Sequence, residues 1–455
     1  MIKVPKVTRL AILVGCQLIA IPTFAQSLEQ AIATTLATNP NIQATYNEFI
    51  SQKETARASV GKYLPSVDLE AAVGYEDNNS KDDDGEDKYP GLNHNQGAAS
   101  VRPHSYNPRY ASLTIRQLLW DGSSTYHDIK RTKAEAESER YQLLADAQDM
   151  ALSTTEAYMD VLQAQEVLTL SQTNLDVHNR IYSDIKRRTD SGLSSTADLI
   201  QVEGRVAQAN TNLISAQNNL NDKITAFTRI VGNQPQDLKK PAVDKTYIAK
   251  SLPDALEKAK ANNPTMYLAA HDVDAATHQY KQNAGTMLPT FTVEASQING
   301  QHNDFTHDEK NETSVMLKMN YNLYNGGSDA ATTRSMAAQL AKSKNVRDNA
   351  YRLLEESTRL SWSAKELAES QEKFLQQHVD ASAKTIIAYE KQYKIGQRTL
   401  LDLLNTENEL FEARKAYLAA HYAGIVADYR LLNSTGLLLN ELRVAIPDEW
   451  AQSSK

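Results

Sequence analysis

Two short turns contain the residues of this sequence whose charge is best placed to do chemistry. Each turn has a glycine, Gly192 or Gly396, that can end a helix in the left-handed conformation. Asp198 and Asp402 follow in the first turn of the next predicted helix, where the helix dipole favours an anion. A purely structural role as turn and helix cap therefore explains both glycines and both acids.

Tyr393 and Arg398 in the second turn are not explained by that structural role. Arg398 precedes Asp402 by four residues, which places the two side chains on one face of a helix. We therefore take Tyr393 and Arg398, with Asp402 beside them, as candidates for a role beyond turn and cap.

No catalytic constellation accompanies these residues. The sequence has no glycine-rich phosphate loop, no His-Glu-x-x-His motif and no nucleophile elbow. His271 and His278 lie two helical turns apart, and a solvated helix face is enough to explain them. We expect no enzyme activity, no cofactor and no metal site. The net charge of -8 argues against nucleic acid as a partner.

Long helices are predicted to carry both turns. Residues 123–191 and 328–395 contain neither Gly nor Pro, and their apolar residues recur at spacings of three and four. A continuous helix of such length spans roughly 100 Å. No compact domain needs such a helix, so the chain is expected to form a tube, a tether or a fibre.

The chain is a tandem duplication of one large unit. Residues 27–40 match residues 251–264, which lie 224 positions later. The segments 119–122 and 323–326 match at a smaller distance of 204 positions. The first copy therefore carries 20 extra residues, all between Pro65 and Leu119.

This duplication divides the chain into five parts. They are a signal peptide (1–25), a first repeat (26–232), a linker (233–250), a second repeat (251–436) and a C-terminal tail (437–455). Each repeat predicts one helix that ends at a Leu-Pro pair (28–63 and 252–287), two strands, a long helix and a return helix. The four strands are expected at 66–75, 110–120, 290–298 and 313–324.

The four strands alternate between apolar and polar residues, which fits a half-buried sheet or a transmembrane barrel. The barrel is favoured because the polar positions include charges and because the strands are about 10 residues long, enough to cross a bilayer. Trp120 and Tyr324 occupy equivalent strand ends, where interface aromatics belong. Four strands cannot close a barrel, so the barrel requires an oligomer.

The N-terminus predicts export from the cytoplasm. A basic start, an apolar stretch from Leu10 to Ile21 and a small residue at Ala25 form a signal peptide. Cys16, the only cysteine, also ends a segment like a lipoprotein cleavage box, so either lipidation of Cys16 or removal of the whole segment remains open. The rest of the sequence has no run of 18 apolar residues.

These features together resemble the TolC family of outer membrane exit ducts. The resemblance rests on the duplicated unit, the Leu-Pro pairs, the Trp-Asp-Gly and Tyr-Asn-Gly-Gly segments, and Tyr-x-x-Gly-x-Arg-Thr-x-x-Asp-Leu from Tyr393 to Leu403. It covers nearly the whole mature chain. It implies a mainly α homotrimer in the outer membrane, with a shared 12-stranded β-barrel and a helical tunnel that extends far into the periplasm.

The resemblance also implies partners and residue roles. The duct would dock onto a periplasmic adaptor and an inner-membrane partner, either an ABC transporter or a proton-driven pump, and would contact outer membrane lipid. Tyr393 and Arg398 would tie the second repeat to Asp198, and Asp402 would line a constricted pore. Asn405 stands where the family prototype has a second acid. The residues of the two turns that would face the adaptor are Gly192, Leu193, Ser194, Gly396 and Gln397.

Two kinds of export are compatible with this family resemblance. The long first hairpin loop and the absence of a firm lipid-anchor signal favour type I protein secretion. Multidrug efflux is the alternative. A periplasmic coiled-coil structural protein is the rival from a different class, because the helices alone are not specific.

Overall fold

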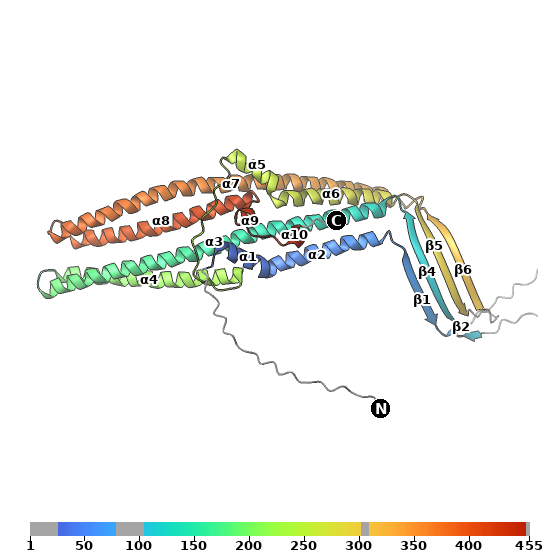
Figure 1. Cartoon of the computed structure of the whole chain (residues 1–455), viewed down its shortest axis with the longest axis horizontal. Helices are drawn as coiled ribbons and strands as arrows, with labels where there is room; N and C mark the ends of the chain where they lie inside the picture. Colours follow the sequence, from blue (N-terminus) through green and yellow to red (C-terminus); the bar gives the residue numbers. More distant parts are fainter. Residues whose placement is uncertain (1–25, 79–103, 302–308, 452–455) are drawn as a thin grey trace, which may run out of the picture.

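The computed structural model describes residues 26–78, 104–301 and 309–451, and shows an elongated molecule (Figure 1). Long helices occupy most of its length, and a small sheet lies at one end. The predicted fold class, mainly helical with a small β part, is confirmed. No helix in the described part of the chain has the length and apolar content needed to span a bilayer.

The elements follow the same order in both repeats. The first repeat contains α1 (Leu28–Thr38), α2 (Pro40–Gly61), β1 (Ser66–Val73), β4 (Arg109–Trp120), α3 (Ser124–Asp190) and α4 (Thr196–Val231). The second contains α5 (Leu252–Asn262), α6 (Pro264–Gly285), β5 (Thr290–Gln301), β6 (Glu309–Asn320), α7 (Ser328–Lys394) and α8 (Leu400–Ser434). Four short elements complete the list, namely β2 (Glu76–Asn78), β3 (His104–Tyr106), α9 (Leu438–Glu441) and α10 (Asp448–Ala451).

The first helix expected in each repeat is in fact two helices. Pro40 is the first residue of α2, and the ring of a proline excludes the preceding residue from the helical region. Asn39 is accordingly extended, with ψ at 125°, and its side-chain amide donates to the carbonyl of Ile230 at 2.9 Å. Asn263 repeats this arrangement with Ser434 at 3.0 Å. The expectation of one helix over 28–63 was therefore wrong, and the break anchors each entering helix to a return helix.

The sheet has the strand order β1-β4-β5-β6, and all its pairs are antiparallel. Its register puts apolar residues opposite apolar residues on one face, as in the pairs Leu69–Leu113 and Val293–Leu317. Strand β6 ends at Asn320, four residues before the expected end, because Asn320 already pairs with the first residue of β5. Strands β1 and β6 are left as open edges.

The other face of the sheet carries a row of charges that crosses all four strands. Arg116 lies 4.0 Å from Asp68 and 3.3 Å from Glu294, and Lys318 lies 2.6 Å from Glu294. Positive and negative side chains alternate along the row, so each cation is adjacent to an anion. The sheet is therefore two-faced, apolar on one side and charged on the other.

The main hydrophobic core lies near the middle of the helical part, away from the sheet. It combines α1, the stretch of α3 from Leu143 to Leu162, and the end of α8. Tyr158 is fully buried there, and its hydroxyl lies 2.7 Å from the carbonyl oxygens of Gln26 and Lys239. The predicted tail also joins this core, since Trp450 is buried. The linker, the first described residues and the tail thus all contact the same hydrophobic core.

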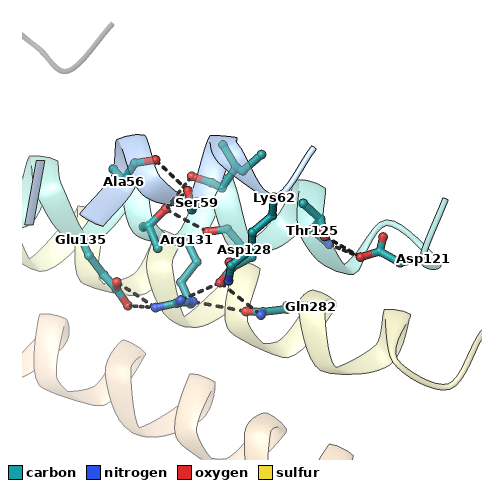
Figure 2. A network of polar contacts seen from close by, with 11 residues as sticks. Ala56, Ser59, Lys62, Asp121, Thr125, Asp128, Arg131, Glu135 and Gln282 are labelled. Carbon is teal, nitrogen blue, oxygen red and sulfur yellow. Dashed lines mark hydrogen bonds and ion pairs between the residues drawn. The ribbon is translucent and has the colours of Figure 1, made fainter. Parts of the chain in front are cut away.

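A polar network near the sheet fastens α2 and α6 to α3 (Figure 2). The buried carboxylate of Asp128 accepts hydrogen bonds from Lys62 at 2.6 Å, Arg131 at 2.6 Å and Gln282 at 3.1 Å. Arg131 also forms two hydrogen bonds with Glu135. Burial alone would raise the pKa of Asp128, but the bonds from Lys62 and Arg131 outweigh it and lower the pKa. Asp128 is therefore an ionised link between three helices.

Candidate gate at the helical tip

The tip opposite the sheet consists of two similar helical turns. The first joins α3 to α4 through Gly192, and the second joins α7 to α8 through Gly396. Both glycines have positive φ angles, 73° and 75°, as a left-handed helix stop requires. The amide of Leu193 donates to the carbonyl of Arg188 at 2.7 Å and closes the first turn. The structure thus bears out the turn geometry expected from glycine.

Asp198 acts as a helix cap in the first turn. Its carboxylate accepts a hydrogen bond from Ser194 at 2.9 Å and from the amide of Ser195, while the Ser195 hydroxyl accepts from the Asp198 amide. The Ser194 hydrogen bond is the main reason why the pKa of Asp198 lies below its ordinary value, with Ser195 adding to it. Asp198 therefore carries its charge at the tip while it caps α4.

Asp402 has the same capping role in the second turn. It accepts hydrogen bonds from the hydroxyl and the amide of Thr399, at 2.9 Å and 3.2 Å, and these lower its pKa. Arg398 lies 3.9 Å from Asp402, as the spacing of four residues suggested. Arg398 also donates to Gln392 at 3.1 Å, and its guanidinium lies 4.4 Å from the ring centre of Tyr389. The described contacts of Arg398 thus lie within its own hairpin, whereas the expectation was a contact with Asp198.

Tyr393 is the member of the second turn that reaches the first repeat. Its ring packs against a small cluster of buried residues drawn from both hairpins, namely Ile185, Val202, Leu400 and Leu404. The guanidinium of Arg188 lies 5.6 Å from its ring centre. Burial raises the pKa of Tyr393, with the charge of Asp198 acting in the same direction and Arg188 opposing it. The predicted proximity of Tyr393 to the Asp198 turn is therefore present in a single chain.

A further link between the two hairpins was not expected from the sequence. Arg205 of α4 donates to the side-chain oxygen of Asn405 in α8 at 2.7 Å. Asn405 is the residue at the position of the second acid of the family prototype. The two residues lie 200 positions apart, and no local sequence pattern predicts their contact. An amide at this position accepts from Arg205 without adding a negative charge to the tip.

The remaining predicted site residues lie on the surface. Leu193 is 81% exposed in the first turn, and Ile395, which precedes Gly396, is 68% exposed in the second. At the sheet, Trp120 ends β4 and contacts Phe291 at 6.0 Å between ring centres. Tyr324 lies just past β6 and is 82% exposed. The adaptor-facing and membrane-interface roles of these residues remain predictions.

Some predictions concern residues that the structure does not describe. They are the signal peptide with Cys16, and the central part of the long polar loop, 79–103. Within the described ranges, no group of three or more His, Cys, Asp or Glu residues is arranged to hold a metal ion.

The sequence matches the family model described as "Outer membrane efflux protein" over residues 31–233 and 255–437. Among curated proteins it is 27% identical to the outer membrane efflux protein BepC of Brucella suis over 71% of each chain. It is 22% identical to the outer membrane protein TolC of Salmonella enteritidis, over 94% of this chain and 86% of that protein. The alkaline protease secretion protein AprF of Pseudomonas aeruginosa is 23% identical over 73% of this chain and 70% of its own.

Solved structures show the same fold. The channel CusC superposes with a TM-score of 0.77 at 13% identity, covering 90% of this chain and 92% of that one. The outer membrane protein VceC of Vibrio cholerae gives a TM-score of 0.73 at 15% identity, covering 90% of this chain and 96% of that one.

Proposed function

The chain belongs to the outer membrane efflux protein family, and from this premise we propose that three copies form the exit duct of a type I protein secretion system. It is an outer membrane channel protein of tripartite export systems, with a long periplasmic helical part, and it is not an enzyme. The duct is a passive conduit. The energy for export comes from an inner-membrane partner, reached through a periplasmic adaptor.

One observation carries the trimeric duct, namely the open-edged sheet at the end of two pairs of long helices (Figure 1). Each repeat supplies two strands and a helical hairpin, so repeated units can alternate around a ring. Closing the ring removes the edges of β1 and β6, which a bilayer would not tolerate unpaired. The apolar face then meets lipid and the charged face lines the lumen.

The protein-secretion role is supported by AprF among the relatives and by the 20 extra residues in the first hairpin. BepC, an outer membrane efflux protein, and CusC, a cation efflux system protein, support efflux instead, and multidrug efflux is the alternative. Deleting the gene from its host distinguishes the two. Loss of one or more large proteins from the culture medium, restored by complementation, supports secretion. Unchanged secretion with increased sensitivity to toxic small molecules supports efflux.

The tip residues are proposed to hold the periplasmic end of the duct closed. We expect Arg398→Ser combined with Tyr393→Phe to raise single-channel conductance in planar bilayers. The double change removes the guanidinium that contacts Asp402, Gln392 and Tyr389, and the hydroxyl beside the first repeat. The control is Arg359→Ser in the same long helix, where an exposed arginine pairs with Glu355 far from the tip. Conductance equal to wild type in the double variant would assign these residues to turn and cap roles only.

Asp402 is proposed to form a ring of three carboxylates around the pore axis. Carboxylates that face one another create a cation site, so multivalent cations should block the channel. Asp402→Asn keeps an acceptor for Thr399 while removing the charge, and should relieve the block without loss of trimer. Because Asn405 replaces the second acid, the block should be weaker than with two acidic rings. Full cation sensitivity in the Asp402→Asn channel would place the site elsewhere.

A further inference from the structure

We infer that β6 of one copy pairs with β1 of the next in one defined register, in which Leu317 lies opposite Val73 of the neighbouring copy. The inference rests on the proposed trimeric duct and adds the residues that meet at each junction. It uses only the duplication of the chain and the strand pairing within one copy.

The duplication is preserved residue by residue in the two hairpins of the sheet. In the first hairpin Ser66 pairs with Arg116. The equivalent residues of the second hairpin are found 224 positions later in β5 and 204 positions later in β6. They are Thr290 and Asn320, and they pair with each other. Adding 224 to a residue number in β1 and 204 to its partner's number in β4 therefore gives a pair that is also opposite in β5 and β6, so the two hairpins have the same register.

The joint between the repeats is the β4–β5 pair. There Leu113 lies opposite Gln297, and Arg116 lies opposite Glu294. In a closed ring the repeats alternate, so the joint between copies is equivalent to the joint within a copy. Strand β6 takes the place of β4, and β1 of the neighbouring copy takes the place of β5. Adding 204 to Leu113 gives Leu317, and subtracting 224 from Gln297 gives Val73. Leu317 is therefore placed opposite Val73 of the neighbouring copy.

This register was derived without reference to hydrophobicity, yet it keeps the apolar faces of the two strands on the same side of the sheet. It places Met319 opposite Ala71, Tyr321 opposite Leu69 and Asn320 opposite Glu70. Leu69, Val73 and Leu317 are 75%, 83% and 68% exposed in the single chain and would become neighbours on the apolar face. A slip of one residue would put each apolar side chain against the charged face.

The register also accounts for the early end of β6. Within one copy, residues 321–324 extend beyond the start of β5 and have no strand beside them. In the β4 strand, the equivalent residues up to Trp120 do pair with β5, across a register shift. In the assembled ring, β1 of the neighbouring copy supplies this partner, and Tyr324 lies opposite Val67. The strand would then reach the end predicted from the sequence.

The charged row continues across the same junction. Within each hairpin, from Asp68 to Arg116 and from Glu294 to Lys318, the row moves two residues closer to the helices, whereas Arg116 and Glu294 lie directly opposite each other at the joint between the repeats. In the proposed register Lys318 lies opposite Ala72 of the neighbouring copy, so Glu70 of that copy is its diagonal neighbour, two residues closer to the helices. Diagonal neighbours of this kind are within reach of long side chains. The three rows then join into one closed belt of charge in the lumen.

Disulfide cross-linking tests the register. Opposite residues of antiparallel strands have Cα atoms about 4.5–5.5 Å apart, which suits a disulfide, whereas diagonal pairs about 7–8 Å apart do not. In a Cys16→Ser background, Leu317→Cys with Val73→Cys should give covalent trimers on a denaturing, non-reducing gel. Strands β1 and β6 of one copy are separated by β4 and β5, so a bond within one chain cannot form.

The control variants combine Leu317→Cys with Ala71→Cys, Ala72→Cys or Tyr75→Cys, and little cross-linking is expected from each. Strongest cross-linking in one of these would overturn the register and leave the trimeric duct intact. Native trimers with no cross-linking in any variant would overturn the β6–β1 junction. Absence of trimers from the wild-type protein would instead reject the proposed assembly. For the charged belt, losses of trimer thermal stability that simply add for Glu70→Gln and Lys318→Gln would overturn that contact.

Discussion

Replacing Leu113 or Leu317 by arginine is expected to impair trimer assembly by about 2–4 kcal/mol per chain, the cost of a cation on the lipid face of a barrel near mid-bilayer depth. Leu113 lies opposite Leu69, and Leu317 lies opposite Val293, all on the apolar face of the sheet. Because three copies carry the change, the losses combine in one assembly. The amount of heat-resistant trimer in outer membrane fractions measures the effect.

Ser112→Arg and Ser314→Arg are the matched controls. Ser112 lies opposite Glu70 on the charged face, and Ser314 forms a hydrogen bond with Ser296 across the β5–β6 pair. An arginine at either position would face an aqueous lumen, so trimer levels should fall far less. Equal damage from both sets of variants would reject the assignment of the two faces.

Removing the carboxylate of Asp128 is expected to destabilise the helical part by about 3 kcal/mol, the lower end of the cost of breaking a buried ion pair. The Asp128 side chain is only 3% exposed, and its loss leaves Lys62 and Arg131 without their shared anion. The cost stays at the lower end because Arg131 keeps Glu135 and because Lys62 is 60% exposed. Denaturant unfolding of Asp128→Ala, followed by helical circular dichroism, measures it.

Asp184→Ala is the control within the same helix. Asp184 is 45% exposed and pairs with Arg187 and Arg188, so its loss should cost less than about 1 kcal/mol. Similar losses in both variants would show that the Asp128 network adds little beyond a surface ion pair.

The Asp128 contribution should also depend on pH in a defined direction. The folded pKa of Asp128 lies below the ordinary value of 3.8. Its stabilisation is therefore complete above the pKa of the unfolded carboxyl and is lost as the pH falls through the lower folded pKa. The stability difference between wild type and Asp128→Asn should stay constant from about pH 7 to pH 5 and shrink below about pH 4. A difference that grows on acidification would contradict the assigned ionisation.

The sequence was most informative where one local rule decides the structure. The stretches without Gly or Pro became α3 and α7, and the turn glycines took positive φ angles. Alternating residues separated the two faces of the sheet correctly, because the side-chain direction in a strand has a period of two. The break at Asn39-Pro40 was equally local and was missed, although a proline disfavours a helical conformation in the residue before it.

Contacts between distant segments could not be predicted in this way. Asp128 meets Lys62 and Gln282 only because three helices lie side by side, and nothing near Asp128 in the sequence marks it as buried. The partner of Arg398 depends on which of several nearby acceptors the packed tip offers, and Gln392 and Tyr389 were not considered. The contact of Arg205 with Asn405 requires the two repeats to be placed relative to each other first.

The position of the main core, near the middle of α3, allows a small tilt of this helix to move its tip by a large distance. The core grips α3 between Leu143 and Leu162, and the helix continues for 28 residues to Asp190, roughly 40 Å further. A tilt of α3 by about 5° about the core therefore moves the tip by roughly 4 Å, which is longer than a hydrogen bond. At the tip itself, the buried cluster of Ile185, Val202, Leu400 and Leu404 and the hydrogen bond from Arg205 to Asn405 resist the movement. A small tilt of α3 about the core is thus amplified into a displacement of several ångströms at the tip, while the core itself stays packed.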